Sequence, residues 1–337
     1  MRSPRSRYQL DNRQAEVITP VGILYREGKP AYRLSAPKAL LIRDGEQVEL
    51  TDGVHLRALD GSSLVITGER AVWTPNDDLL VLEGSPKAED PLQRLTADHA
   101  QFNSKNEELQ LRKNLVLKRW NKGQSHREPA QLVLRSPEAD WNLKDGGLTV
   151  AGPVRGVQRP EVNRQRLLSA SALIGNTSEN WIDFQPPVTV DEASEGLALR
   201  AGKTRWWTEE NRLSSSAPAQ GTIKKLKASG GGFELWEDRQ ELLLTSGCQL
   251  NQPDQSLTAT QCRWNWESGQ LMARGSVELR RQKPKQITRA ELMQGVTGND
   301  GQIRFTAPDS RVRTELEFDQ SGSTPSSGQN QSPPAQF

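Results

Sequence analysis

Apolar and polar residues follow one pattern that recurs along the chain at intervals of 27 to 39 residues. Its clearest copies are Leu95–Phe102, Ile66–Trp73 and Leu257–Trp264, with the order aliphatic, any, small, two polar, small, any, aromatic. The third residue, which we call the anchor, is Ala36, Gly68, Ala97, Ser136, Ala170, Ala201, Ala228 or Ala259, with a decayed copy at Arg289. A fixed internal period is the signature of repeat proteins, so the pattern predicts stacked structural repeats.

Two positions of the repeat carry large apolar side chains. The residue two before the anchor is always aliphatic: Leu34, Ile66, Leu95, Leu134, Leu168, Leu199, Leu226, Leu257 and Ile287. The residue five after the anchor is Leu41, Trp73, Phe102, Trp141, Trp206, Phe233 or Trp264, and Gly175 and Gln294 are the exceptions. The two sets predict two rows of interior side chains. If two sheets splay around these rows, the space between them is an apolar groove.

The second half of each copy predicts another strand. A polar turn such as Asn103–Glu108 follows the first strand, and a short apolar segment then ends at glycine, as Leu80–Leu82 does before Gly84. Each unit of about 30 residues therefore has the order strand, turn, strand, turn, with strands of about 5 to 8 residues. The chain is predicted to be all-β.

The side-chain phase requires an irregularity within each unit. Residues of equal parity share one face of a strand, so the aliphatic and aromatic rows would point to opposite faces of a regular strand. A β-bulge, for example at Asp98-His99 or Glu69-Arg70, would return both rows to one face. The alternative is that one strand ends there and another begins.

The pattern also bounds the domain organisation. The repeats occupy residues 21–318. Residues 1–20 are predicted to be a flexible segment that lacks a membrane anchor, because Arg2, Arg5 and Arg7 precede a polar stretch instead of an apolar one. Residues 319–337, rich in Ser, Pro and Gln, predict a disordered tail. The widest interval contains a polar segment at 120–130, which is either a protruding loop or a seam in the array.

Composition and charge remove several classes of function. The 44 basic and 42 acidic residues leave a net charge of +2, which gives no strong field for binding nucleic acid. The hydrophobic fraction of 34% predicts a thin core, unlike that of a large globular enzyme. Cys248 and Cys262 are too few for a disulfide scaffold, and the pattern leaves open whether they pair.

No catalytic or metal-binding constellation is recognisable. The histidines His55, His99 and His126 lie in different repeats without metal-ligand spacing, and no phosphate-binding loop or nucleophile elbow occurs. Acidic pairs such as Glu107-Glu108 are interpreted as solvated turn charges. We expect no catalytic residue, no metal and no cofactor.

Three other segments have a structural interpretation. Gly230–Gly232 lies inside a strand and predicts a bulge or a close backbone approach. The basic segments Lys224–Lys227 and Arg280–Lys285 could meet phosphate, but solvated loops are the commoner case.

The phrases Leu95-Thr-Ala-Asp-His-Ala-Gln-Phe-Asn and Ile66-Thr-Gly-Glu-Arg-Ala-Val-Trp, each followed by Leu-x-Leu, resemble the OstA-like units of the LptA and LptC family of lipopolysaccharide-export proteins. The resemblance covers residues 20–318. Tyr25–Ala39 is most similar to the start of LptC, and the length is similar to that of the long cyanobacterial members. The resemblance implies an elongated antiparallel β-jellyroll that is folded like a taco.

The resemblance also implies a function in lipopolysaccharide transport. The protein would reside in the periplasm, associated with the inner membrane through an anchor absent from this sequence. It would hold the acyl chains in its groove and pass the lipid from the inner-membrane ABC transporter towards the outer membrane. The groove residues would be Leu34, Ile66, Trp73, Leu95, Phe102, Leu134, Trp141, Leu168, Leu199, Trp206, Leu226, Phe233, Leu257 and Trp264. An LptA-like periplasmic bridge protein, a purely structural solenoid and a carbohydrate-active β-helix enzyme are the alternatives.

The last strand candidate, Val312–Phe318, alternates apolar and charged residues as an exposed edge would. Its residues Val312, Thr314, Leu316 and Phe318 are the expected docking edge. The resemblance implies that this edge receives an LptA-like bridge or the N-terminal domain of the outer-membrane translocon, and that the N-terminal edge meets the ABC transporter.

Overall fold

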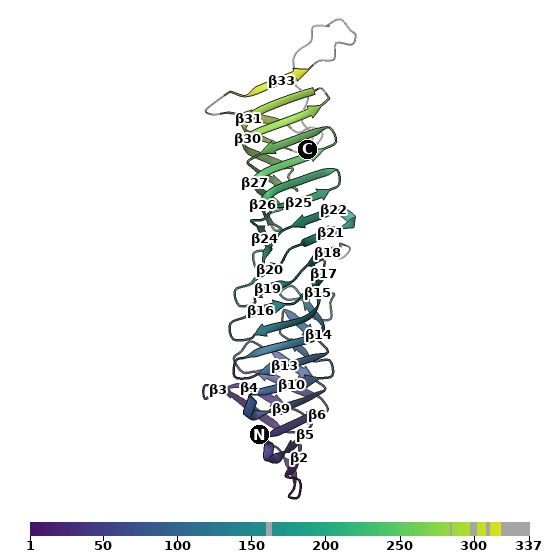
Figure 1. Cartoon of the computed structure of the whole chain (residues 1–337), viewed down its shortest axis with the longest axis vertical. Coiled ribbons are helices and arrows are strands. Elements are labelled where there is room, and N and C mark those ends of the chain that lie inside the picture. Colours follow the sequence, from purple (N-terminus) through teal and green to yellow (C-terminus); the bar gives the residue numbers. More distant parts are fainter. Residues whose placement is uncertain (160–163, 284, 297–301, 308–310, 318–337) are drawn as a thin grey trace. The chain divides into compact units, whose positions relative to one another are not determined.

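The computed structural model describes residues 1–159, 164–283, 285–296, 302–307 and 311–317 (Figure 1). Helix in these ranges is limited to three 3₁₀ turns, Arg43–Gly45, Pro75–Asp77 and Ala193–Glu195, and none of them is long enough to cross a bilayer. All other regular structure in the same ranges is β-strand, with antiparallel pairing throughout. The predicted all-β antiparallel fold class is confirmed. The chain divides into two compact units, Met1–Asn180 and Trp181–Phe337.

Unit 1 consists of two β-sheet layers that share the long strands β14 (Glu108–Arg119) and β15 (Leu132–Asn142). The aromatic layer, named for Trp73, Phe102 and Trp141, has the order β1 (Arg5–Gln9), β2 (Gln14–Ile18), β5 (Lys38–Ile42), β6 (Gln47–Thr51), β9 (Arg70–Thr74), β10 (Leu79–Glu83), β13 (His99–Asn103), first half of β14, second half of β15, β16 (Gly147–Val150), β19 (Leu173–Asn176). The aliphatic layer, named for Leu34, Ile66 and Leu95, has the order β3 (Val21–Arg26), β4 (Lys29–Ser35), β7 (Val54–Ala58), β8 (Val65–Gly68), β11 (Lys87–Glu89), β12 (Gln93–Thr96), second half of β14, first half of β15, β17 (Val154–Gln158), β18 (Arg166–Ala170).

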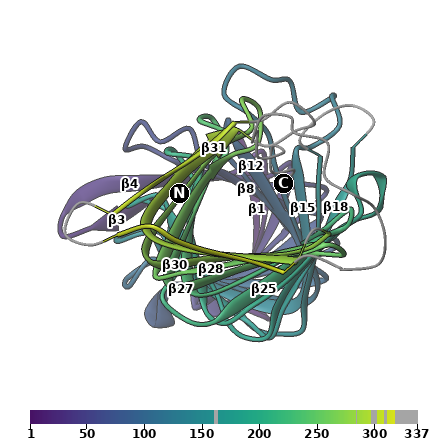
Figure 2. The same ribbon diagram turned by 90° about the horizontal axis from the view of Figure 1, so that it is seen from above.

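Unit 2 repeats this plan, and Figure 2 shows its strands β27, β28 and β30 stacked behind one another. Its aromatic layer has the order β20 (Trp181–Phe184), β23 (Thr204–Trp207), β24 (Arg212–Ser215), second half of β26 (Leu226–Trp236), first half of β27 (Glu241–Gln252), β29 (Gln261–Asn265), first half of β30 (Gln270–Gln282), second half of β31 (Lys285–Val296), β32 (Ile303–Thr306). Its aliphatic layer has the order β21 (Val188–Glu192), β22 (Leu197–Ala201), β25 (Ala219–Ile223), first half of β26, second half of β27, β28 (Gln255–Ala259), second half of β30, first half of β31, β33 (Arg313–Glu317).

The two layers join at corners, where the chain crosses from one layer to the other. At five of the crossings two consecutive residues have positive φ: Asp52-Gly53, Gly84-Ser85, Lys113-Asn114, Ser246-Gly247 and Gly275-Ser276. A left-handed conformation costs a non-glycine residue about 1 kcal/mol or more, so the surrounding strand pairs must hold these corners in place. Both crossings of a repeat lie at the same end of its strands. The hairpin turns at the other end form two free edges, which we call the aromatic lip and the aliphatic lip after their layers.

The corners also change the side-chain phase, so that both rows face the interior. Leu95 and Ala97 before a corner and Ala100 and Phe102 after it are all buried. Strand β12 ends at Thr96 and β13 begins at His99, with Asp98 in the break between them, which is the second of the two alternatives that the sequence left open.

In β26 the phase changes by a bulge instead, because its register with β27 shifts between Gly230 and Gly232. A Cβ atom on Gly231 would lie 2.6 Å from the carbonyl oxygen of Ser246. The close backbone approach expected at this glycine run is therefore present.

The ninth repeat is displaced by one residue from the sequence prediction. Leu279 pairs with Thr288 and Val277 pairs with Ala290, so Thr288 and Ala290 share the interior face. Thr288 is 1% exposed. The predicted interior residue Ile287 lies on the outer face, and the prediction failed because Ile287 is the only aliphatic residue near the expected position.

Three segments lie outside the repeat pattern: the N-terminal residues, the polar segment 120–130 and the C-terminal tail. Residues 5–9 and 14–18, expected to be flexible, form β1 and β2, and β2 pairs with β5. The polar segment 120–130 lies in the loop between β14 and β15, where Trp120 is 3% exposed. The boundary between the two compact units follows Asn180. The tail predicted at 319–337 lies outside the described residues.

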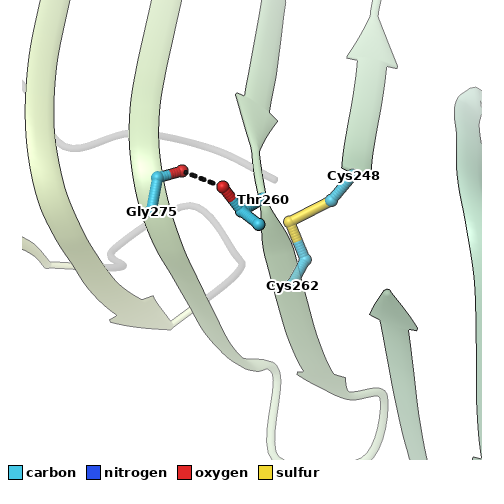
Figure 3. The surroundings of a disulfide bond; sticks show 4 residues. All are labelled: Cys248, Thr260, Cys262 and Gly275. Atoms are coloured by element: carbon cyan, nitrogen blue, oxygen red, sulfur yellow. Dashed lines mark hydrogen bonds between the residues drawn. A yellow bond between two sulfur atoms is a disulfide. The ribbon is translucent and has the colours of Figure 1, made fainter. Parts of the chain in front are cut away.

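Cys248 and Cys262 form a disulfide bond, which Figure 3 shows. Cys248 follows the corner at Ser246-Gly247 and lies in the aliphatic half of β27, whereas Cys262 lies on β29 of the aromatic layer. Between them, Thr260 donates its hydroxyl to the carbonyl oxygen of Gly275 at 3.2 Å. The bond therefore ties the two layers together beside a corner.

We expect that replacing both cysteines with serine lowers the free energy of unfolding by about 3 kcal/mol, because the bond closes a loop with a sequence separation of 14 residues. Urea unfolding followed by tryptophan fluorescence measures the loss. The wild-type protein in reductant should unfold like the double variant, and the double variant should not respond to reductant. Two reactive thiols in the unfolded, unreduced wild-type protein would contradict the bond.

Candidate lipid-binding groove

The fourteen predicted groove residues share the interior faces of the two layers. In unit 1 they are Leu34 (β4), Ile66 (β8), Leu95 (β12), Leu134 (β15) and Leu168 (β18) of the aliphatic layer and Trp73 (β9), Phe102 (β13) and Trp141 (β15) of the aromatic layer. In unit 2 they are Leu199 (β22), Leu226 (β26) and Leu257 (β28) opposite Trp206 (β23), Phe233 (β26) and Trp264 (β29). Each unit thus has one aliphatic row and one aromatic row, and their contact with lipid stays a prediction.

Burial differs between the two units. In unit 1, Leu34, Ile66, Leu95 and Phe102 are at most 2% exposed. In unit 2, one continuous row of interior residues next to the aromatic lip is partly exposed: Trp206, Leu213, Leu235, Leu242 and Trp264. Trp73 and Leu168 of unit 1 are partly exposed, but only unit 2 has a continuous row of partly exposed apolar side chains along its mouth in the described residues.

In unit 1 a polar contact bridges the two lips. The Tyr32 hydroxyl on β4 donates to Glu107 Oε1 in the β13–β14 turn at 2.8 Å, and Arg26 forms an ion pair with Glu107 Oε2. The Tyr32 ring packs edge-to-face on Phe102, with ring centroids 5.0 Å apart. Burial, and then the hydrogen bond to Glu107, raise the pKa of Tyr32 far above its ordinary value, so the phenol remains a donor.

Glu107 is therefore not the solvated turn charge that the sequence predicted. Its side chain is 4% exposed and closes the mouth of unit 1. The sequence carries no signal of this role, because both partners lie more than 70 residues away along the chain.

Unit 2 carries a second set of tryptophans on the outer face of its aromatic layer. The Arg205 guanidinium lies 4.2 Å from the ring centroid of Trp181 and 5.3 Å from that of Trp207. Arg205 also makes two contacts with Asp183, of 2.6 and 2.8 Å. Burial alone would raise the pKa of Asp183, but hydrogen bonds from Arg205 and Lys203 hold it below its ordinary value. The doubled Trp206-Trp207 could have revealed this outer row, because adjacent strand residues face opposite sides.

An open depression of about 760 Å³ lies beside the corners of unit 2, on the outer surface of the aliphatic layer, where the outer-face row Arg200, Gln220, Ser229, Gln249 and Thr258 lines it. Small residues on five strands contribute to its lining: Ala201, Ala219, Gly230, Gly247 and Ala259. Two of these, Ala201 and Ala259, are repeat anchors.

The described residues contain no group of three or more His, Cys, Asp or Glu side chains that could hold a metal ion. His126 stacks on Trp120 with centroids 4.1 Å apart, and its Nδ1 lies 2.6 Å from Glu89 Oε1. The interior rows therefore provide apolar surface, and the polar groups around them make structural contacts.

We expect the Glu107→Ala variant to lose about 1 to 3 kcal/mol of stability, because it leaves the buried Tyr32 hydroxyl without its acceptor. Adding Tyr32→Phe should recover part of the loss, since the orphaned hydroxyl is then removed. A double-mutant cycle from urea unfolding measures this coupling. Strictly additive losses would show that the two side chains do not depend on each other.

Comparison with known protein families gives a match in the N-terminal part of the chain. Residues 1–81 match the family described as lipopolysaccharide-assembly, LptC-related. Among solved structures the chain is similar to LptH, the LptA homologous periplasmic component of the lipopolysaccharide transport device from Pseudomonas aeruginosa. The identity is 10%, over 44% of this chain and 79% of that chain, with a TM-score of 0.21. No curated protein matches the sequence. The match over residues 1–81 confirms the recognition made from the repeat motifs.

Proposed function

We propose that this protein is a periplasmic component of the lipopolysaccharide export machinery, which holds acyl chains between its two layers. It passes the lipid from the inner-membrane ABC transporter towards the outer membrane. The observation that carries this proposal is the LptC-related segment at residues 1–81 in a chain whose interior rows are apolar and, in unit 2, accessible. Each CH₂ group of an acyl chain buried there contributes about 0.8 kcal/mol, so several chains together would be held firmly.

One feature of the molecule supports the proposed compartment. The Cys248–Cys262 disulfide suits an oxidising compartment such as the periplasm. A carrier of this kind needs no reacting side chain, so we infer a non-enzymatic role in which transfer is driven by the transporter.

Photo-crosslinking side chains test the groove directly. We expect such residues at Trp206 and Trp264, which face the interior of unit 2 and are partly exposed, to capture lipopolysaccharide. Matched substitutions at Asp77 and Glu209, which are exposed in aromatic-lip turns, should capture much less. Phe102, at 0% exposure, should capture little unless unit 1 opens. Equal capture at the interior and turn positions would remove the groove from the proposal.

The C-terminal edge is the proposed docking site for the next component, an LptA-like bridge or the N-terminal domain of the outer-membrane translocon. Within the described residues β33 pairs with β31 alone, and Val312 and Leu316 are 41% and 50% exposed. Thr314 is exposed on the same strand, whereas Phe318 lies outside the described residues. Such an edge offers unpaired backbone groups that can extend a sheet into a partner.

In unit 1, β1 is the first strand of the aromatic layer; in the described structure it pairs with β2 alone, and its five residues are exposed. This N-terminal edge is the proposed contact with the ABC transporter.

We expect deletion from Val312 onward, or Arg313→Pro, to abolish binding of the bridge partner in a pull-down while lipid binding persists, because proline removes a ladder donor at the edge only. The Arg313→Gln variant, which keeps the backbone N–H, is the matched control and should bind normally. If the truncated chain still retains the partner, the docking edge lies elsewhere.

A further inference from the structure

The lips of unit 2 differ sharply in charge. The aromatic lip carries four exposed carboxylates in its turns, Glu209, Glu210, Asp238 and Glu267, against one exposed arginine, Arg239. The aliphatic lip carries exposed lysines in two of its hairpin turns: Lys224 and Lys225 between β25 and β26, and Lys283 between β30 and β31. The turn between these two contains one carboxylate, Asp254. An anionic group at the mouth of unit 2 is therefore attracted to the aliphatic lip and repelled by the aromatic lip.

One arginine of the aliphatic lip points inward. Leu257 pairs with Leu279 and Gln255 pairs with Arg281, so Arg281 shares the interior face with these leucines and lies one step closer to the lip. Its side chain is partly buried, and burial lowers the pKa of Arg281. A guanidinium in such a place is stabilised by an anion, and a guanidinium pairs especially well with the oxygens of a phosphate group.

The position of Arg281 fits the polar end of an amphiphile. Acyl chains at the mouth would contact the partly exposed row that includes Leu242 and Trp264, because Leu257 and Leu279, at 0% and 2% exposure, are covered by the protein's own side chains. The first polar group beyond the chains would then reach the level of Arg281, and groups further out would reach the lysines. The two lysine-bearing turns are separated by four strand spacings, or about 19 Å, so the lip can serve a headgroup with more than one anionic group.

We propose that the aliphatic lip of unit 2 binds the phosphate groups of a lipid headgroup, with Arg281 as the inner ligand and Lys225 and Lys283 as outer ligands. The site rests on the proposed function, because the acyl chains place the headgroup at the mouth. It gives a role to Lys225 and Lys283, which lie in the two basic segments Lys224–Lys227 and Arg280–Lys285. It also defines the orientation of the lipid, with the phosphates turned towards the aliphatic layer.

The test compares diphosphoryl lipid A with the same lipid after enzymatic removal of its phosphates, using the full chain. Arg281→Gln should weaken binding of diphosphoryl lipid A about tenfold, as expected for loss of a charge-assisted hydrogen bond, and leave the dephosphorylated lipid unaffected. The Lys225→Gln/Lys283→Gln double variant should act in the same direction. Arg281→Lys should restore most of the affinity.

Arg274→Gln is the matched control, because Arg274 lies on the same strand, β30, at its corner end and on the outer face. It should bind both lipids like the wild-type chain. Millimolar inorganic phosphate should not displace the lipid, and displacement would indicate a free-anion site instead of a headgroup site.

The outcomes separate this inference from the function on which it rests. If the wild-type chain binds neither lipid, the proposed function fails, and the headgroup site fails with it. If the wild-type chain binds both lipids, while Arg281→Gln and the lysine variant match it on both, only the headgroup site is overturned. Equal losses on the two lipids would also overturn it, because they would indicate altered packing of the mouth.

Discussion

The change of side-chain phase at each corner is the constraint on which the rest of the structure depends. A strand that ran straight from the aliphatic row to the aromatic row would turn one of them towards solvent. The chain avoids this with a strand break, as at Asp98, or a bulge, as at Gly231, and it returns through paired left-handed residues such as Lys113-Asn114. These corners enclose an apolar interior in a chain with only 34% hydrophobic residues, because the large apolar residues of the two rows, apart from Ile287, lie on one face.

Much of the fold could be predicted from the sequence because one motif encodes it many times. The aliphatic and aromatic positions recur in register, so errors in single copies average out, and the interior faces of Leu95, Trp141 and Leu257 follow directly. Prediction failed where the information is not repeated. In the ninth copy the motif was placed on Ile287, although the interior residue is its neighbour Thr288. The strands β1 and β2 have no counterpart elsewhere in the chain, so the repeat pattern did not predict them.

The parts of the site that escaped prediction depend on contacts between distant residues. Glu107 meets Arg26 and Tyr32 only because the two lips of unit 1 approach each other, and nothing local distinguishes it from Glu108. The pairing of Cys248 with Cys262 depends on the geometry of a corner, where the two Cα atoms lie 5.8 Å apart. Sequence periodicity specifies which face a residue occupies, but it does not specify which turn it meets across the interior.

The placement of the corners has a consequence for how such a chain can change over evolutionary time. An insertion of one residue within a strand would turn every side chain between the insertion and the next corner to the opposite face of the sheet. An insertion in a lip turn would leave both interior rows unchanged. The loop between β14 and β15, which accounts for the widest of the repeat intervals, shows an insertion of this permitted kind. The chain is therefore free to elaborate at its lips and can otherwise lengthen only by whole repeats, so new recognition groups are acquired at the mouth without alteration of the interior.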